Sequence, residues 1–164
     1  MSKQEEAPDY FAEGNEHLKA GRYKEAIEAY EAFLKEGESA DVHNNLGLAH
    51  FQNGDLDTAT KEFEKALTLA PDFAPAHANM GLALLNKKEF AEAVGPLEKA
   101  LALDPNLAEA NYNLGLALYR SGKVAEAIVA YERFIAEAPG SYKNYIEGVE
   151  QILQQLKKQQ QDAS

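Results

Sequence analysis

The sequence predicts an all-α fold in which pairs of helices stack one after another. The first observation is a repeated pattern, Asn-(Leu/Met)-Gly-Leu-Ala, at residues 45–49, 79–83 and 113–117. Its glycines, Gly47, Gly81 and Gly115, lie 34 residues apart, and a weaker copy at Gly14 lies 33 residues before Gly47. The second observation is that each period holds two apolar stripes with helical spacing. A period of this length is typical of a solenoid.

Composition and charge exclude several classes of protein. With 45% hydrophobic and 26% charged residues, the chain of 164 residues is expected to fold. It has no cysteine, which excludes disulfides, thiolate chemistry and cysteine-ligated zinc. No apolar run approaches the roughly 20 residues that cross a bilayer, and the N-terminus has no apolar core like that of a signal peptide. We therefore expect no membrane insertion and a cytoplasmic protein.

The net charge of -11 argues against nucleic acid as a partner, because phosphate binding needs a basic surface. The charge is uneven, at -5 over residues 1–40 and zero over residues 140–164. Two interpretations remain open. The acidic side chains either keep the helices soluble or orient a partner along the gradient.

Four helix pairs follow one another along the chain. Apolar spacing predicts them at residues 7–20 and 23–35, 41–53 and 56–69, 74–87 and 89–103, and 108–121 and 123–137. Gly21 separates the first two helices, and Pro71, Pro105 and Pro139 close the later pairs. All connections are short, so successive helices should pack side by side. Gly95-Pro96 interrupts one helix interior, and we expect a kink or widened turn near Val94.

A last helix at residues 141–158 has one apolar stripe, from Tyr142 to Leu156, and one polar face. It is expected to cap the fourth pair, because a stack needs a polar surface at its end. The alternative is that the stripe dimerises. The predicted organisation is a disordered N-terminus (1–6), repeats at 7–39, 40–73, 74–107 and 108–140, the final helix (141–158) and a disordered tail (159–164).

The repeats resemble the tetratricopeptide repeat family. In that family a small residue lies midway along the first helix of each unit and another lies early in the second. The chain matches at Gly14, Gly47, Gly81 and Gly115, and at Ala26, Ala59, Ala93 and Ala127. The first unit departs most, since Glu13 stands where Leu46, Met80 and Leu114 stand and the closing proline is missing. The resemblance implies a right-handed superhelix of four repeats with a C-terminal solvating helix.

The resemblance also implies a concave peptide-binding groove, lined by the first helix of each unit. By this likeness the groove comprises Phe11, Asn15, Asn44, Leu48, Phe51, Gln52, Ala78, Leu82, Leu85, Asn86, Tyr112, Leu116, Tyr119 and Arg120. Its apolar members predict a non-enzymatic scaffold or adaptor that binds an apolar or amphipathic segment of a partner protein. The partner's basic end would face the acidic first unit, and a carboxylate would lie near Arg120.

Three other interpretations receive less support. A self-assembling scaffold would use the first unit or the last helix to form a homo-oligomer. A co-chaperone that captures a terminal carboxylate would need cations where the chain has Phe11, Pro75 and Asn79; only Asn15 and Asn45 match that pattern. Asn45, Asn79 and Asn113 are expected to form a structural ladder; the alternative is that their side-chain amides hold a peptide backbone. No catalytic residue, metal ligand or cofactor is expected, because His17, His43, His50 and His77 fit no catalytic or metal-binding pattern.

Overall fold

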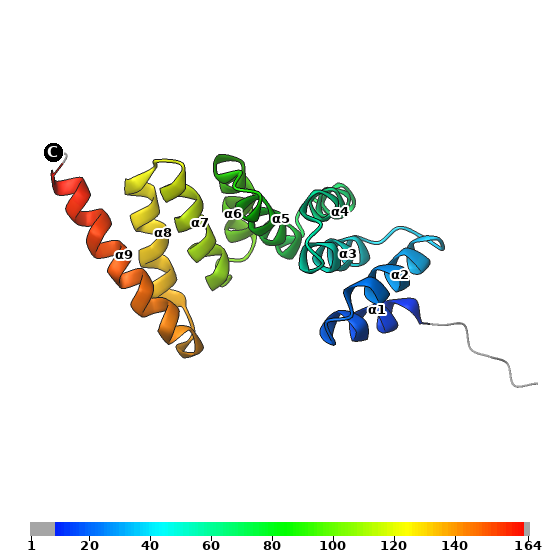
Figure 1. Cartoon of the computed structure of the whole chain (residues 1–164). Helices are drawn as coiled ribbons and strands as arrows, with labels where there is room; N and C mark the ends of the chain where they lie inside the picture. The colour runs from blue at the N-terminus through cyan, green and yellow to red at the C-terminus, as the bar shows by residue number, and fades with distance from the viewer. Residues whose placement is uncertain (1–8, 163–164) are drawn as a thin grey trace, which may run out of the picture. The chain divides into compact units, whose positions relative to one another are not determined.

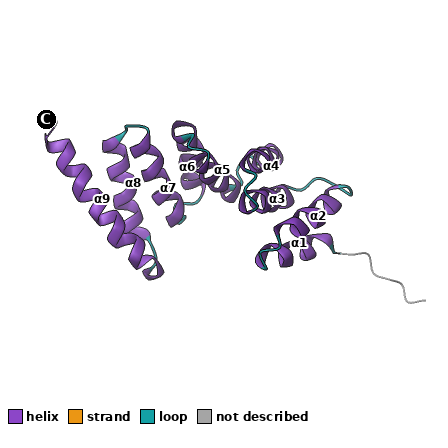
Figure 2. Ribbon diagram, in the orientation of Figure 1, coloured by secondary structure: helices purple, strands orange, loops and turns teal. Residues whose placement is uncertain are grey.

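The computed structural model describes residues 9–162, and the secondary structure of this range is entirely helical (Figures 1 and 2). The all-α class predicted from the sequence is confirmed. The helices are α1 (Tyr10–Lys19), α2 (Tyr23–Leu34), α3 (Ala40–Gln52), α4 (Leu56–Leu69), α5 (Ala74–Asn86), α6 (Phe90–Leu103), α7 (Ala108–Arg120), α8 (Val124–Glu137), the 3-10 turn η1 (Gly140–Tyr142) and α9 (Lys143–Asp162). The predicted disordered N-terminus at 1–6 and the last two residues of the predicted tail lie outside the described range.

The chain divides into two compact units. Unit 1 ends at Pro71 and contains α1 to α4, in which each helix packs against the next. Unit 2 begins at Asp72 and contains α5 to α9, in which α6 packs on α5 and α7, and α8 packs on α7 and α9. The helices α5 and α7 also contact each other. Each unit therefore holds two helix pairs, and unit 2 adds the final helix.

The small residue midway along the first helix of each pair allows a large side chain of the second helix to approach. A Cβ added at Gly47 would lie 2.6 Å from Cε1 of Phe63. A Cβ at Gly115 would lie 2.6 Å from Cδ1 of Tyr131. The other two pairs repeat the contact, with Gly14 against Tyr30 and Gly81 against Leu97. Only glycine permits this spacing, which explains the period seen in the sequence.

The turn inside each helix pair needs one residue with positive φ. Glycine provides it at Gly21, Gly54 and Gly122, with φ of 72°, 89° and 80°. The third pair uses Lys88 instead, at φ 64°. A side chain with a Cβ is strained in this region, so the turn of the third pair carries a conformational cost that the other three avoid.

The first and the last helix differ most from their expected bounds. The first helix begins at Tyr10, because the Asp9 side chain caps it by accepting a hydrogen bond of 3.0 Å from the backbone N–H of Ala12. The last helix extends to Asp162, beyond the expected end at residue 158. The added residues are three glutamines and Asp162, and glutamine is compatible with helix, so the first four residues of the predicted tail continue the helix.

Helix α6 continues through Pro96 as α-helix, so the widened turn expected near Val94 is not formed, while the alternative of a kink stays a prediction. The carbonyl that loses its hydrogen-bond donor belongs to Glu92, whose side chain is exposed, as is neighbouring Gly95. Water can therefore hydrate this side of the helix, while the buried residues Ala93 and Leu97 hold the opposite side in the core.

The apolar stripe of α9 packs inside unit 2. Val149, Leu153 and Leu156 are buried in the same hydrophobic cluster as Tyr131 and Phe134 of α8. The polar face of the helix remains exposed, as expected for the end of a stack. Capping of the fourth helix pair thus occupies Val149, Leu153 and Leu156, and dimerisation through the last helix stays a prediction.

Candidate functional site

Unit 2 contains two adjoining pockets between α5, α7 and the beginning of α9. The first has a volume of about 340 Å³ and the second about 300 Å³. Both are lined by Leu82, Glu109, Asn113 and Tyr142, so they form one continuous depression, which we call the groove. The first pocket adds Pro75, Ala78, Asn79, Asn106, Leu107, Ala108, Ala110 and Pro139, and the second adds Tyr112, Phe134 and Tyr145.

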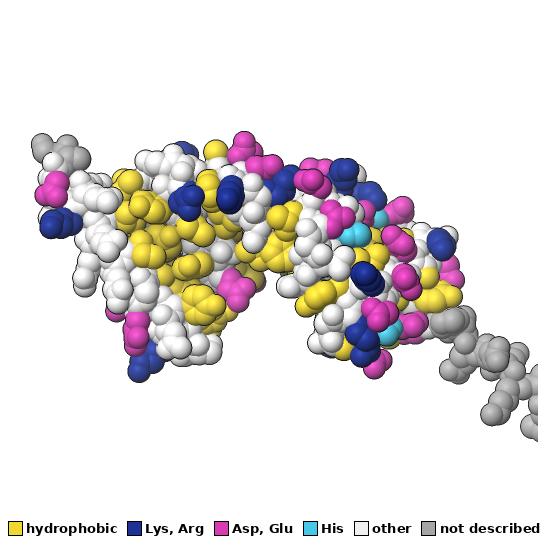
Figure 3. Space-filling model, viewed as in Figure 1, with side chains coloured by type: hydrophobic (Ala, Val, Ile, Leu, Met, Phe, Trp, Pro, Cys, Tyr) yellow, Lys and Arg dark blue, Asp and Glu magenta, His cyan; other side chains and the backbone are white. Residues whose placement is uncertain are grey.

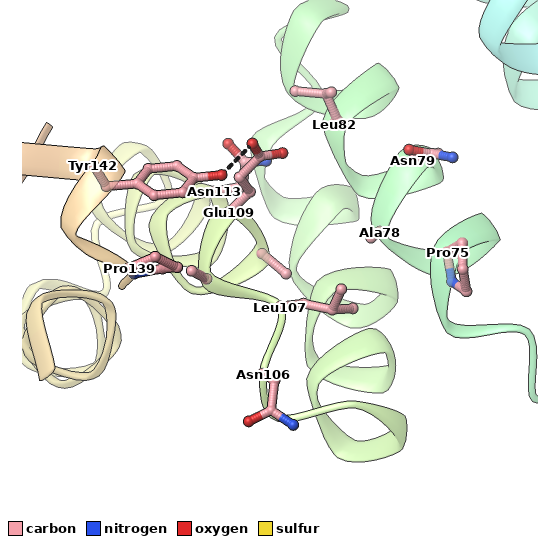
Figure 4. A pocket seen from close by; sticks show the side chains of 12 residues that line it. Pro75, Ala78, Asn79, Leu82, Asn106, Leu107, Glu109, Asn113, Pro139 and Tyr142 are labelled. Carbon is pink, nitrogen blue, oxygen red and sulfur yellow. Dashed lines mark hydrogen bonds between the residues drawn. The ribbon is translucent and has the colours of Figure 1, made fainter. Parts of the chain in front are cut away.

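Helical spacing brings the walls of the groove together. On α5, Pro75, Ala78, Asn79 and Leu82 follow at intervals of three and four residues and share one face. On α7, Glu109, Tyr112 and Asn113 do the same one repeat later. Since α5 and α7 contact each other, the two faces form adjacent walls. The 3-10 turn before α9 adds Tyr142 from the opposite side (Figure 4).

A hydrogen bond joins the two sides of the groove. The Tyr142 hydroxyl donates to Oε1 of Glu109 at 2.6 Å, and Figure 4 shows the two side chains pointing toward each other. The hydrogen bond to this carboxylate raises the pKa of the Tyr142 phenol. Glu109 is the only charged side chain among the described residues that line the two pockets. The groove is thus an apolar surface with a single negative charge.

Four aromatic rings surround the second pocket. Tyr112 lies 5.6 Å from Phe134 and 6.0 Å from Tyr145, measured between ring centroids. Tyr142 lies 5.9 Å from Phe134 and 5.9 Å from Tyr145. Each ring therefore packs against two of the others. Phe134 is buried and Tyr145 is 59% exposed. We call these four rings and Glu109 the aromatic cluster.

The surface view agrees with an apolar site in unit 2. Hydrophobic side chains gather over the part of unit 2 that contains α7 and α8 (Figure 3). Unit 1 shows acidic, basic and histidine side chains mixed on the same face. Apolar surface concentrated in one place on a protein commonly marks a binding site.

Only some of the predicted groove residues of unit 2 line the groove. Ala78, Leu82 and Tyr112 line the groove. Leu116 packs partly buried against the core, and Tyr119 is exposed outside both pockets. The prediction that Leu85 faces a groove is wrong, since Leu85 is only 7% exposed and belongs to the core of unit 2.

Two predicted polar residues at the end of these helices also lie outside the groove. The Asn86 side chain donates to the backbone oxygen of Leu82 at 2.9 Å, within its own helix. The guanidinium of Arg120 lies over the ring of Phe90, 4.4 Å from its centroid. The charged residue of the groove is therefore Glu109 and not Arg120.

In unit 1 three of the predicted residues serve packing. Phe11 lies 6.5 Å from Tyr30 and 6.0 Å from Phe33 between ring centroids. Asn15 accepts hydrogen bonds from the Tyr30 hydroxyl at 2.7 Å and from Asn45 at 2.9 Å. Asn44 is 5% exposed and donates to Asn45, so the prediction of a surface role for Asn44 is wrong. Leu48 and Phe51 are half-buried and Gln52 is exposed.

Unit 1 also holds a buried polar network around His43. Its Nδ1 contacts Oε2 of Glu62 at 2.7 Å, and its Nε2 contacts Glu38. Lys65 donates to the other oxygen of Glu62 at 2.8 Å. The hydrogen bond from His43 lowers the pKa of Glu38. Among residues 9–162 no group of three or more His, Cys, Asp or Glu side chains is arranged to hold a metal ion.

Comparison with known proteins identifies the repeats. The sequence model of the tetratricopeptide repeat family matches residues 11–74 and 78–142, which is most of the chain. The chain is a member of the tetratricopeptide repeat family. Photosystem I assembly protein Ycf3 of Prochlorococcus marinus is 35% identical over 74 residues, which are 43% of this chain and 43% of that protein. The match therefore spans less than half of the length of that relative.

Solved structures show the same fold. The crystal structure of MamA has a TM-score of 0.73 and 24% identity, and covers 92% of this chain and 95% of that chain. The structure of YrrB, described as a tetratricopeptide repeat protein with an unusual peptide-binding site, has a TM-score of 0.71 and 25% identity, and covers 80% of this chain and 68% of that chain. Family and fold support a role in protein interaction. None of the described helices is both long enough and apolar enough to span a membrane.

Sequence reasoning did not include Glu109, Tyr142 and Tyr145 in the site. Glu109 lies one helical turn before Tyr112 on the same face of α7, which is a signal that the sequence carries. Tyr142 and Tyr145 begin the apolar stripe of the last helix, which is expected to cap the fourth pair or to dimerise and not to line a groove. The contact between Tyr142 and Glu109 joins residues 33 positions apart in different elements, so no local pattern predicts it.

Proposed function

We propose that this protein is a non-enzymatic interaction scaffold that binds an apolar or amphipathic peptide segment of a partner protein in the groove of unit 2. The observation that carries this proposal is the pair of adjoining pockets, which share four lining residues and together continue from α5 to α9. A row of connected pockets suits an extended segment, whose successive side chains can enter separate depressions.

The walls supply both kinds of contact that such a segment needs. Ala78, Leu82 and Leu107 offer apolar surface in the first pocket. Removal of one leucine-sized side chain from water contributes about 1.5 to 3 kcal/mol, part of which is lost to the entropy cost of ordering the peptide. The side-chain amide of Asn113, which lines both pockets, can donate to and accept from a peptide backbone. The described peptide-binding site of YrrB supports a role of this kind for a related fold.

The test begins with selection of random displayed peptides on the full chain, followed by fluorescence anisotropy with the selected peptides. Leu82→Glu places a charge in the wall shared by the two pockets and should weaken binding by about tenfold or more. The matched control is Val129→Glu on α8, since Val129 is 49% exposed and lies outside the groove. The proposed site would be contradicted if both substitutions weakened peptide binding equally, or if neither weakened it.

A further inference from the structure

We infer that the second pocket of the groove binds the guanidinium group of an arginine in the peptide. This inference rests on the proposed function and adds the chemical class of the partner. The pocket is walled by the aromatic cluster, in which four rings and one carboxylate surround about 300 Å³. Aromatic faces attract cations through their quadrupole, and a carboxylate adds a full opposite charge.

The cluster is held in place before any ligand arrives. Phe134 is 1% exposed and fixed in the core of unit 2, and Tyr112 packs against it with 5.6 Å between ring centroids. Tyr142 is fixed by its 2.6 Å hydrogen bond to Glu109. Tyr145 is largely exposed and forms the outer wall. A site whose walls are already ordered binds without the cost of arranging them.

The charge of the pocket selects a cation. Glu109 uses Oε1 to accept from Tyr142, and the carboxylate has further acceptor sites on Oε2. No Lys or Arg is among the described residues that line either pocket. A ligand carboxylate would therefore meet Glu109 as a like charge. An apolar side chain would cover Glu109 without providing a donor, which is costly for an ionised group.

Arginine fits these walls better than lysine. Its planar guanidinium stacks on rings, is more weakly hydrated than an ammonium group and donates in a fixed direction to a carboxylate. The first pocket shares Leu82 and Asn113 with the second. Its lining is mainly apolar, and the polar groups are the Glu109 carboxylate and the side-chain amides of its asparagines. The structure therefore assigns a ligand in which an arginine lies next to an apolar residue.

The test compares peptides selected by the wild-type chain and by Glu109→Gln. Glutamine keeps an acceptor for the Tyr142 hydroxyl and removes only the charge, so the fold should be unchanged. The wild type should enrich peptides with arginine next to an apolar residue, and Glu109→Gln should enrich apolar residues without arginine. Replacing the arginine of a selected peptide by citrulline, its neutral analogue, should weaken binding to the wild type about tenfold. The same replacement should change binding to Glu109→Gln less than about twofold.

Each of the other outcomes contradicts the arginine inference alone or the inference together with the proposed function. If selected peptides lack arginine but lose affinity with Leu82→Glu, the inference falls and the proposed function stands. If citrulline weakens binding equally in the wild type and Glu109→Gln, the arginine binds elsewhere and the inference again falls. If lysine peptides bind as tightly as arginine peptides, the assignment of a guanidinium is wrong. If the wild type enriches no peptide, both the inference and the proposed function fall. Tyr145→Ala, which removes an exposed wall, should weaken arginine peptides more than apolar ones.

Discussion

Gly115→Ala tests the packing that sets the repeat period. The new Cβ would lie 2.6 Å from both Cδ1 and Cε1 of Tyr131 and 2.9 Å from its Cγ. Tyr131 is 1% exposed, and Tyr112 packs against it with 6.1 Å between ring centroids, so the ring has little room to retreat. Overpacking of this kind costs about 1 to 3 kcal/mol. Alanine also gains roughly 1 kcal/mol over glycine inside a helix, which partly offsets the loss.

Gly148→Ala is the matched control, because no atom lies within 4 Å of a Cβ at this position inside α9. It gains the helix propensity without the overpacking and should raise the free energy of unfolding by up to about 1 kcal/mol. Both residues belong to unit 2, so both variants report on the same part of the chain. Urea unfolding followed by circular dichroism should place Gly115→Ala about 1 to 3 kcal/mol below Gly148→Ala. Equal stabilities would refute the close-packing explanation of the glycine period.

Three further predictions concern stability. His43→Leu leaves the buried Glu62 with Lys65 as its remaining ionic partner, so it should lower the free energy of unfolding by about 3 kcal/mol in a urea titration. Glu38→Gln changes the exposed end of the same network and should lower the free energy of unfolding much less. Lys88→Gly relieves a positive φ of 64° and should raise the thermal midpoint, with a gain of about 1 kcal/mol; a lower midpoint would contradict the strain assigned to this turn. Burial raises the pKa of Tyr30 from 10.0 to about 12. The stability that the buried neutral phenol contributes to the folded state is therefore fully present below pH 10 and is lost as the pH rises through 12. Urea midpoints measured across this range should fall, and a fall of the same size in Tyr30→Phe would show that Tyr30 is not the cause.

The sequence is sufficient to predict the helices because their signals are local. Gly47, Gly81 and Gly115 recur with one period, and each must face a large side chain one helix later. The short turns and closing prolines then place helix ends to within a few residues of the observed bounds. Pro96 does not end its helix, because its local cost does not outweigh the packing of Ala93 and Leu97 on the buried side of the same helix.

The site is less predictable because burial depends on neighbouring helices. Leu85 and Leu82 lie one turn apart on α5 and are chemically identical, yet the core covers Leu85 and the groove exposes Leu82. The position of Tyr142 depends on where the 3-10 turn begins after Pro139, which apolar periodicity does not encode. Binding at Leu48 and Phe51 of unit 1, self-assembly and a cytoplasmic location stay predictions.

The most direct test of the central claim is a measurement of contacts between the protein and a selected peptide. Nuclear Overhauser effects between the peptide and the methyl groups and aromatic rings of the protein identify the residues of the bound surface. The account predicts contacts from the peptide to the methyl groups of Leu82 and to the rings of Tyr142 and Tyr145. Contacts confined to residues outside the groove, such as Leu69 or Val129, would contradict it, because both are exposed and line neither pocket.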